Sequence, residues 1–373
     1  MDHKRNNTVY TTISTLLLSG FDCVVFFSHF ASLAASIILH LAQLCPMWFP
    51  ISSVVLVLLA VTTSATNLER QTHEQRRLKE ANIFSMSSSC QCKSTSRPCL
   101  FIHGELNGNE EKELQTSSKY FGDMTSHAPC CSSIKYVSLD TNSHGWTDGT
   151  LQETVCKHAL SMSTTSDVKE KIIKDTILVT HSMGALILAG AVANMKCSIE
   201  TISTSWVSMS APMLGTLLSN AAQDVCTHDG WRPFRKVFLL VGQCPVNTGI
   251  KSLAYMGGIY STIALNEEYT KAQKAYRDNV QGAMCSNGYL GIASKYQSQY
   301  MALATYVNHG TSEHDGFVTF ESCRGGFPAT KFDDKPTSAF YVTTCNHADT
   351  AFLTGNAYFS NAMEPVQWFE CLL

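Results

Sequence analysis

The sequence predicts an α/β protein in which a mostly parallel β-sheet is covered by helices on both faces. Short apolar runs alternate with helical patterns from about residue 98 to the C-terminus, an order typical of parallel sheets. Hydrophobic residues make up 45% of the 373 residues and charged residues 15%, so the chain can bury a large core and intrinsic disorder is not expected. A chain of this length fits two ordinary domains or one large α/β domain.

Short apolar runs bounded by turn residues mark the strands. The first run is 99–102, which ends at His103-Gly104. Its length suits a strand that is buried on both faces. We expect the later strands at 134–139, 177–179, 204–209, 317–320 and 339–344.

Apolar spacing marks three helices between these strands. Leu151, Val155 and Ala159 recur every fourth residue and therefore share one helical face. Residues 185–193 are apolar on every side, which is typical of a buried helix. Asn266 is the expected N-cap of a third helix. The apolar face of this helix holds Tyr269, Ala272, Ala275, Tyr276 and Val280.

Residues 1–65 form an apolar leader. The stretch 11–44 carries a single charged side chain, that of Asp22, and a second apolar run follows at 51–61. The two runs together are too long for one signal peptide. The leader is followed by a polar stretch without a period, residues 66–97, which we expect to be a linker.

Two interpretations of the leader remain open. In the first, residues 2–45 span a membrane or anchor the chain in it, since about 20 apolar residues cross a bilayer. In the second, translation starts at Met47, and a short apolar core ends at small residues, 63–65, of the kind that a signal peptidase recognises. Both interpretations place the remaining domain, 98–373, outside the cytosol.

The charge balance and the motifs exclude some classes of protein. Lysine and arginine number 27 against 30 aspartates and glutamates, a net charge of −3, so the chain has no basic excess for binding nucleic acid. The glycine-rich spacings of phosphate-binding loops are absent from the sequence. We therefore expect no nucleic-acid partner.

Thirteen of the fifteen cysteines lie beyond residue 65. An exported domain with this many thiols is usually cross-linked by disulfides. The odd number leaves at least one cysteine unpaired, and the pairing stays open because a sequence does not reveal it. We expect no metal site at Cys90, Cys92 and Cys99, because no Cys or His pair with the spacing of a zinc finger lies nearby.

The third predicted strand runs directly into Thr180-His181-Ser182-Met183-Gly184 and then into the buried helix. A serine between a buried strand and a buried helix must lie on a very tight turn, which lifts its hydroxyl above the edge of the sheet. The first N–H groups of the helix then point beside that hydroxyl. This turn is the strongest indication of chemistry in the sequence.

The pentapeptide resembles the Gly-x-Ser-x-Gly nucleophile elbow of the α/β-hydrolase family, particularly of its lipases and esterases. Thr180 stands where that family has its first glycine. The resemblance runs from about Cys99 to the C-terminus, with a divergent middle. It implies an α/β-hydrolase fold with a helical cap or lid inserted at about 212–290.

The resemblance also implies catalytic residues in the order serine, acid, histidine. Asp315, in Asp-Gly-Phe-Val, resembles the acid of many lipases, and His347 follows the last predicted strand, where such enzymes carry their histidine. His347 would take the proton of Ser182, and Asp315 would hold the imidazole ring in the useful tautomer. Asp349, two positions after His347, is an alternative acid.

The His103-Gly104-Glu105 stretch resembles the oxyanion loop of lipases. The main-chain N–H groups of Met183 and Glu105 would bind the oxyanion. Because a carboxylate close to the oxyanion would oppose its charge, we expect the side chain of Glu105 to point away from it.

These features imply an exported or anchored serine hydrolase that cleaves carboxylic esters, with lipid acyl esters as the expected class, through an acyl-enzyme. Neither a cofactor nor a metal is expected, and the N-terminal apolar segment would supply any association with a membrane. An acyltransferase or thioesterase on the same triad is one alternative. A catalytically inert hydrolase-like binding or effector protein is the other.

Overall fold

This computed structural model describes residues 90–227, 244–357 and 360–373, which lie in a compact unit spanning Ser87–Leu373. The predicted leader, 1–65, and most of the predicted linker, 66–97, lie outside the described residues. Among the described helices, none combines the length and the hydropathy needed to cross a bilayer.

A six-stranded parallel sheet forms the centre of the part of the chain that the structure describes. Its strands are β1 (Arg97–Ile102), β2 (Cys131–Tyr136), β4 (Ile177–His181), β6 (Ser205–Met209), β7 (Val280–Ser286) and β8 (Phe340–Thr343), and their order is β2-β1-β4-β6-β7-β8. A separate pair is formed by β3 (Ile172–Ile173) and β5 (Ser198–Ile199). The predicted α/β class with a mostly parallel sheet is confirmed.

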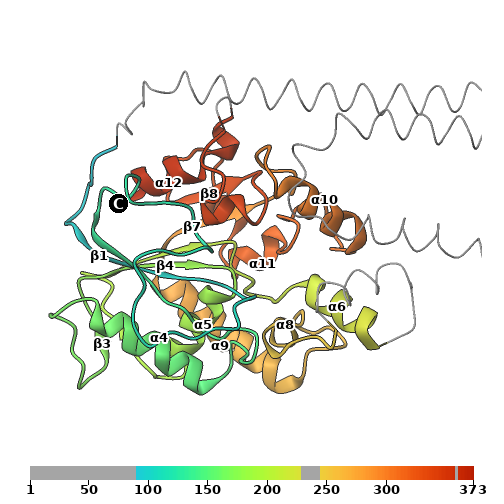
Figure 1. The fold of residues 1–373 in the computed structure, drawn as a ribbon, viewed down its shortest axis with the longest axis horizontal. Helices are drawn as coiled ribbons and strands as arrows, with labels where there is room; N and C mark the ends of the chain where they lie inside the picture. Colours follow the sequence, from blue (N-terminus) through green and yellow to red (C-terminus); the bar gives the residue numbers. More distant parts are fainter. Residues whose placement is uncertain (1–89, 228–243, 358–359) are drawn as a thin grey trace, which may run out of the picture. The chain divides into compact units, whose positions relative to one another are not determined.

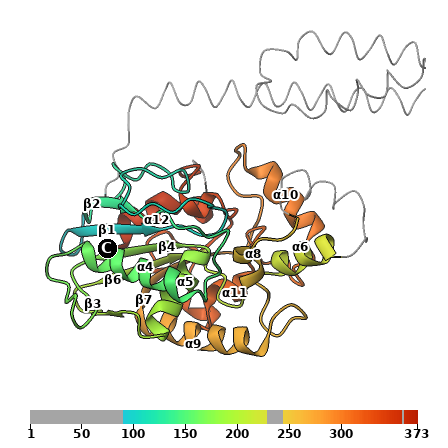
Figure 2. The same cartoon turned by 60° about the horizontal axis from the view of Figure 1, so that its bottom comes forward.

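Helices cover both faces of the sheet, as Figures 1 and 2 show. One face carries α4 (Gly149–Ser161), α5 (Met183–Ala193) and α9 (Ile263–Asn279), and the other carries α12 (Pro365–Leu372). Alternate residues of a strand point to opposite faces. In β1, Leu100 and Ile102 therefore pack in the cluster under α5, whereas Phe101 packs with Phe369 of α12.

The remaining helices lie in the connections between the later strands. They are α6 (Leu217–Thr227), α8 (Thr248–Ser252), α10 (Gln297–Tyr306), α11 (Phe320–Arg324) and the short 3₁₀ turn η1 (Ala329–Lys331). Two further 3₁₀ turns, η2 (Asp349–Ala351) and η3 (Asn361–Met363), follow β8. Helix α9 is capped by Thr262, whose hydroxyl accepts a hydrogen bond from the N–H of Leu265. The expected cap, Asn266, was wrong, because its side-chain oxygen accepts from Gly257 and Ser261 instead.

The strand predicted at 317–320 is also wrong. The carboxylate of Asp315 accepts the N–H groups of Phe317 and Val318, so these groups do not pair with a strand, and Thr319 caps α11. The strand β7 lies within 212–290, so the last part of the range expected for a cap or lid belongs to the sheet. Residues 228–243 of that range lie outside the described residues.

Disulfides cross-link the described domain. Twelve of its cysteines pair as Cys90–Cys371, Cys92–Cys130, Cys99–Cys131, Cys156–Cys197, Cys226–Cys244 and Cys285–Cys323. Cys345 is unpaired and buried. Cross-linking of this density is typical of proteins that fold in an oxidising compartment outside the cytosol.

Candidate active site

Ser182 lies on a strained turn between β4 and α5. Its φ of 55° and ψ of −133° are values that residues other than glycine rarely adopt. A Cβ atom on Gly184 would come within 2.5 Å of the Ile102 carbonyl oxygen, so glycine is required where the helix approaches β1. The hydroxyl of Thr180 accepts a hydrogen bond from Trp206 Nε1 at 2.9 Å, so this side chain points into the core and leaves the turn free.

His347 and Asp315 are joined both by side chains and by the main chain. Nδ1 of His347 donates to Oδ2 of Asp315 at 2.6 Å, and the His347 N–H donates to the Asp315 carbonyl at 3.0 Å. Burial raises the pKa of Asp315, but the charge of His347 and the hydrogen bonds from His347, Val318 and Phe317 outweigh it, so this pKa lies below its ordinary value. Asp315 is therefore a carboxylate that fixes the proton of His347 on Nδ1.

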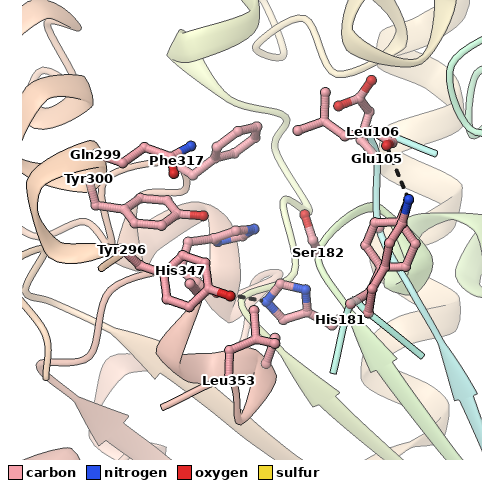
Figure 3. Close-up of a pocket in the computed structure, with 15 residues that line it drawn as sticks. Glu105, Leu106, His181, Ser182, Tyr296, Gln299, Tyr300, Phe317, His347 and Leu353 are labelled. Carbon is pink, nitrogen blue, oxygen red and sulfur yellow. Dashed lines mark hydrogen bonds between the residues drawn. The ribbon is translucent and has the colours of Figure 1, made fainter. Parts of the chain in front are cut away.

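Aromatic rings hold the imidazole of His347 from two directions. The ring of Phe317 stacks on it with the centroids 4.9 Å apart, and the ring of His181 lies 4.6 Å away. With Nδ1 bonded to Asp315, the other ring nitrogen, Nε2, is left free to accept a proton. In Figure 3 this imidazole and the hydroxyl of Ser182 face the same cleft.

The hydroxyl of Ser182 does not form a hydrogen bond with His347 within the described residues. Such bonds are often long in unliganded hydrolases and shorten when the substrate binds. The placement on the strained turn nevertheless aims the hydroxyl at the space in front of the imidazole (Figure 3).

The peptide unit between Gly104 and Glu105 is oriented by hydrogen bonds on its carbonyl side. Nδ1 of His103 donates to the Gly104 carbonyl at 2.7 Å, and the hydroxyl of Thr141 donates to it at 3.1 Å. Because C=O and N–H point in opposite directions across a planar trans peptide, the N–H of Glu105 faces away from these donors. Within the described residues, neither this N–H nor that of Met183 donates a hydrogen bond.

The side chain of Glu105 extends away from Ser182 (Figure 3). Its Oε1 accepts a hydrogen bond from Asn247, the N-cap residue of α8, at 2.7 Å, and its buried Oε2 has no partner among the described residues. Burial raises the pKa of Glu105 to about 7, although the hydrogen bonds from Asn247 and Leu106 lower it. The carboxyl group therefore titrates near neutral pH, outside the space in front of Ser182.

Strands and loops place all these groups at one edge of the sheet. The end of β1 leads into the 103–105 loop, the end of β4 into Ser182, and the end of β8 into His347, while Asp315 lies in the connection between β7 and β8. Serine after a central strand, then the acid, then histidine after the last strand is the arrangement of one fold family. The chain has the α/β-hydrolase fold. The cleft at this edge has a volume of about 230 Å³.

The walls of the cleft come from the loop that follows β1 and from the start of α10. Leu106 lies on one side, and on the other lie Tyr296, the N-cap residue of α10, and Gln299 and Tyr300 within the helix. The α10 residues were not predicted as site residues. No sequence signal pointed to them, because α10 has no apolar period and its residues are at most partly buried.

The alternative acid does not face His347. Oδ2 of Asp349 accepts the N–H groups of Ile292 at 2.8 Å and of Asn346 at 3.1 Å. A Cβ atom on Gly291 would lie 2.0 Å from this oxygen, so the 290–292 loop closes tightly over the carboxylate. Asp349 therefore ties two loops together, and the structure brings Asp315 rather than Asp349 to the imidazole.

Comparisons with known proteins give likenesses at the level of structure alone. No protein-family model matches the sequence, and no curated protein matches it significantly. The mature lipase BlEst2 of Bacillus licheniformis is similar at 15% identity and a TM-score of 0.44, over 70% of this chain and 88% of that one.

Two further lipases are similar at lower values. The Staphylococcus hyicus lipase has 11% identity and a TM-score of 0.37 over 75% of this chain and 94% of its own. Lipase 1 from Pelosinus fermentans has 12% identity and a TM-score of 0.36 over 75% of this chain and 98% of its own. Likenesses this weak carry no argument about activity.

Proposed function

We propose that the protein is a serine hydrolase that cleaves carboxylic esters through an acyl-enzyme. One observation carries the proposal: Nδ1 of His347 is bonded to the buried Asp315 at 2.6 Å, at the cleft that Ser182 faces. A histidine held in this tautomer keeps Nε2 free as a base toward the serine.

The proposed reaction begins when the Ser182 oxygen attacks the ester carbonyl carbon while His347 Nε2 takes the serine proton. The N–H groups of Met183 and Glu105 donate to the oxyanion that forms. His347 then gives its proton to the departing alkoxide, which leaves an acyl-enzyme and an alcohol. Water repeats the sequence in the second half-reaction, so that the carboxylic acid leaves and Ser182 regains its proton.

Lipid acyl esters are the substrate class that the cleft favours. Its lining includes the apolar side chains of Leu106, Phe317, Ala351 and Leu353. Leu106 keeps 49% of its surface exposed at this site. An acyl chain laid against these side chains would bury apolar surface, which stabilises the bound ester.

The proposed place of action is outside the cytosol. The disulfides of the described domain are typical of such a location. Residues 1–65 would serve either as a secretion signal or as an anchor that associates the protein with a membrane.

A fluorophosphonate probe tests the proposed function in the exported protein. The probe forms a covalent bond with an activated serine, so we expect it to label the wild type. Ser182→Ala should not be labelled, and neither should wild type that was first treated with an inhibitor that blocks the serine. His347→Ala should lose labelling to a comparable degree, because the triad acts as a unit. Absence of labelling in a folded wild type would instead favour the inert binding protein.

The products of the reaction distinguish hydrolysis from acyl transfer. With an acyl ester and a mixture of water and alcohol acceptors, a hydrolase releases the free acid as the main product. A new ester or cleavage confined to thioesters would favour the acyltransferase or thioesterase alternative. A series of acyl chain lengths on one alcohol then defines the preferred acyl group.

A further inference from the structure

Helix α10 presents one face to the cleft. Tyr296, Gln299 and Tyr300 are spaced so that they share a side of the helix, and all three line the cleft. Of these, Tyr300 makes a ring contact with the proposed catalytic histidine, His347, and the two ring centroids lie 6.2 Å apart.

The ring of Tyr300 packs on the turn that carries the proposed acid, Asp315. Gly316 follows Asp315 with a φ of 91°, and a Cβ atom at this position would come within 3.0 Å of Tyr300 Cδ1. The phenol ring therefore packs directly on the Asp315-Gly316 turn, and a side chain on residue 316 would push it away. This contact fixes the distance between the phenol and the pair formed by His347 and Asp315.

The hydroxyl of Tyr300 is available as a donor. It forms no hydrogen bond within the described residues, and in Figure 3 it points into the cleft from the side of His347. Burial raises the pKa of Tyr300, and the carboxylates of Asp315 and Asp349 raise it further. The hydroxyl therefore keeps its proton at neutral pH and can donate it in a hydrogen bond.

The two sides of the cleft define how an ester lies in it. The carbonyl oxygen must face the N–H groups of Met183 and Glu105, on the side of the oxyanion loop. The leaving oxygen must lie within reach of His347 Nε2, which protonates it. Tyr300 lies on this second side, across Ser182 from Glu105 (Figure 3).

We propose that the hydroxyl of Tyr300 donates a hydrogen bond to the leaving-group oxygen of esters of aliphatic alcohols; this inference rests on the proposed function. As the carbon–oxygen bond breaks, its electron pair stays on the leaving oxygen. His347 delivers the proton that it took from Ser182, and Tyr300 shares the developing charge while keeping its own proton. An aliphatic alkoxide concentrates negative charge on oxygen and needs this donor, whereas p-nitrophenolate spreads the charge over its ring.

A leaving-group series tests the inference. Esters of one acyl chain with ethanol, trifluoroethanol and p-nitrophenol are compared by kcat/KM, which reports acylation, for the wild type and Tyr300→Phe. We expect kcat/KM to fall about 10- to 100-fold for the ethyl ester and less than about threefold for the p-nitrophenyl ester. The dependence of kcat/KM on the leaving-group pKa therefore becomes steeper in Tyr300→Phe.

Tyr306→Phe is the matched control, since Tyr306 belongs to the same helix and does not line the cleft. In this variant, kcat/KM should depend on the leaving-group pKa as it does in the wild type. The ratio between two substrates does not depend on the fraction of folded enzyme, so partial misfolding cannot imitate the expected result. Equal losses for all leaving groups, or no loss for the ethyl ester, overturn the inference. A wild type without Ser182-dependent ester cleavage overturns the proposed function and this inference with it.

Discussion

The main-chain carbonyl of His347 accepts a hydrogen bond from Nε2 of His181, the residue immediately before Ser182, at 3.1 Å. The hydroxyl of Thr350 donates to the same carbonyl at 2.9 Å. Burial, and then the charge of His347, lower the pKa of His181 well below its ordinary value, so its imidazole stays neutral. The last residue of β4, directly before the proposed nucleophile, is thus bonded to the loop that carries the proposed base.

His181→Phe tests whether this bond positions His347. The phenyl ring preserves most of the packing but removes the donor, so we expect kcat to fall about 10-fold while KM changes little. The free energy of unfolding should fall by about 1 kcal/mol, the usual value of one hydrogen bond. Steady-state kinetics and urea unfolding measure the two effects. An unchanged kcat would show that the carbonyl bond does not position the base.

Asp315→Asn should impair ester cleavage severely. The amide does not hold the imidazole in the required tautomer, and the corresponding change in serine proteases costs roughly 10⁴-fold in kcat. The measurement is kcat on an ester substrate, with circular dichroism to verify folding.

Asp349→Asn is the matched variant for that experiment. Its Oδ2 accepts the N–H groups of Ile292 and Asn346, and its Oδ1 accepts the hydroxyl of Thr354, so an amide whose oxygen keeps the two N–H groups turns its NH₂ toward that hydroxyl and loses the charge-assisted bonds. We expect a loss of about 1 to 3 kcal/mol in the free energy of unfolding and a much smaller loss in kcat than for Asp315→Asn. Equal losses of kcat in two folded variants would contradict the assignment of the acid.

Glu105 should make stability depend on pH. Its pKa rises from an ordinary 4.5 to about 7 on folding, so the folded state holds the proton more tightly than the unfolded state. The contribution is therefore fully present below pH 4.5 and is lost as the pH rises to about 7. A shift of this size corresponds to about 3 kcal/mol.

Glu105→Gln removes this dependence because the amide does not titrate. Between about pH 5 and about pH 8, the free energy of unfolding of the wild type should fall relative to that of the variant. Chemical unfolding of both proteins across this range measures the difference. Parallel pH profiles would contradict a raised pKa for Glu105.

The Cys285–Cys323 disulfide closes a loop that contains Asp315, between β7 and α11. With a sequence separation of 38 residues, its removal should lower the free energy of unfolding by about 4 kcal/mol. The double variant Cys285→Ala/Cys323→Ala is compared with the wild type by urea unfolding. Cys345→Ala breaks no cross-link and should lower the free energy of unfolding by less than about 2 kcal/mol. Similar costs for the two changes would show that loop closure contributes little.

Several features of the site follow from residues that are close together in the chain. The apolar run before Thr180 and the apolar helix after Met183 allow only a tight turn at Ser182, so the strand, the turn and the helix were predicted from the sequence alone. The strand that ends at His103-Gly104 was predicted for the same reason. In these cases the local structure is set by residues that are adjacent in the chain, so it can be predicted from the sequence.

Local patterns failed where distant contacts compete. Residues 280–286 form β7 between β6 and β8, but they follow α9 without a break and contain few strongly apolar side chains, so no strand was predicted. Residues 317–320 have the composition of a strand, yet the carboxylate of Asp315 captures two of their N–H groups. The number of cysteines predicted cross-linking, whereas their pairing depends on which strands become neighbours.

The sequence by itself determined the class of fold, the strained serine turn and the candidates for acid and base. The tertiary structure decided that Asp315 rather than Asp349 reaches His347, that the Gly104 carbonyl is held so that the Glu105 N–H is free, and that Tyr300 enters the cleft. The physical reason is that a hydrogen bond needs two groups within about 3 Å. Spacing along the chain fixes such a distance only within one helix, strand or turn, and between loops it is set by the packing of the whole domain.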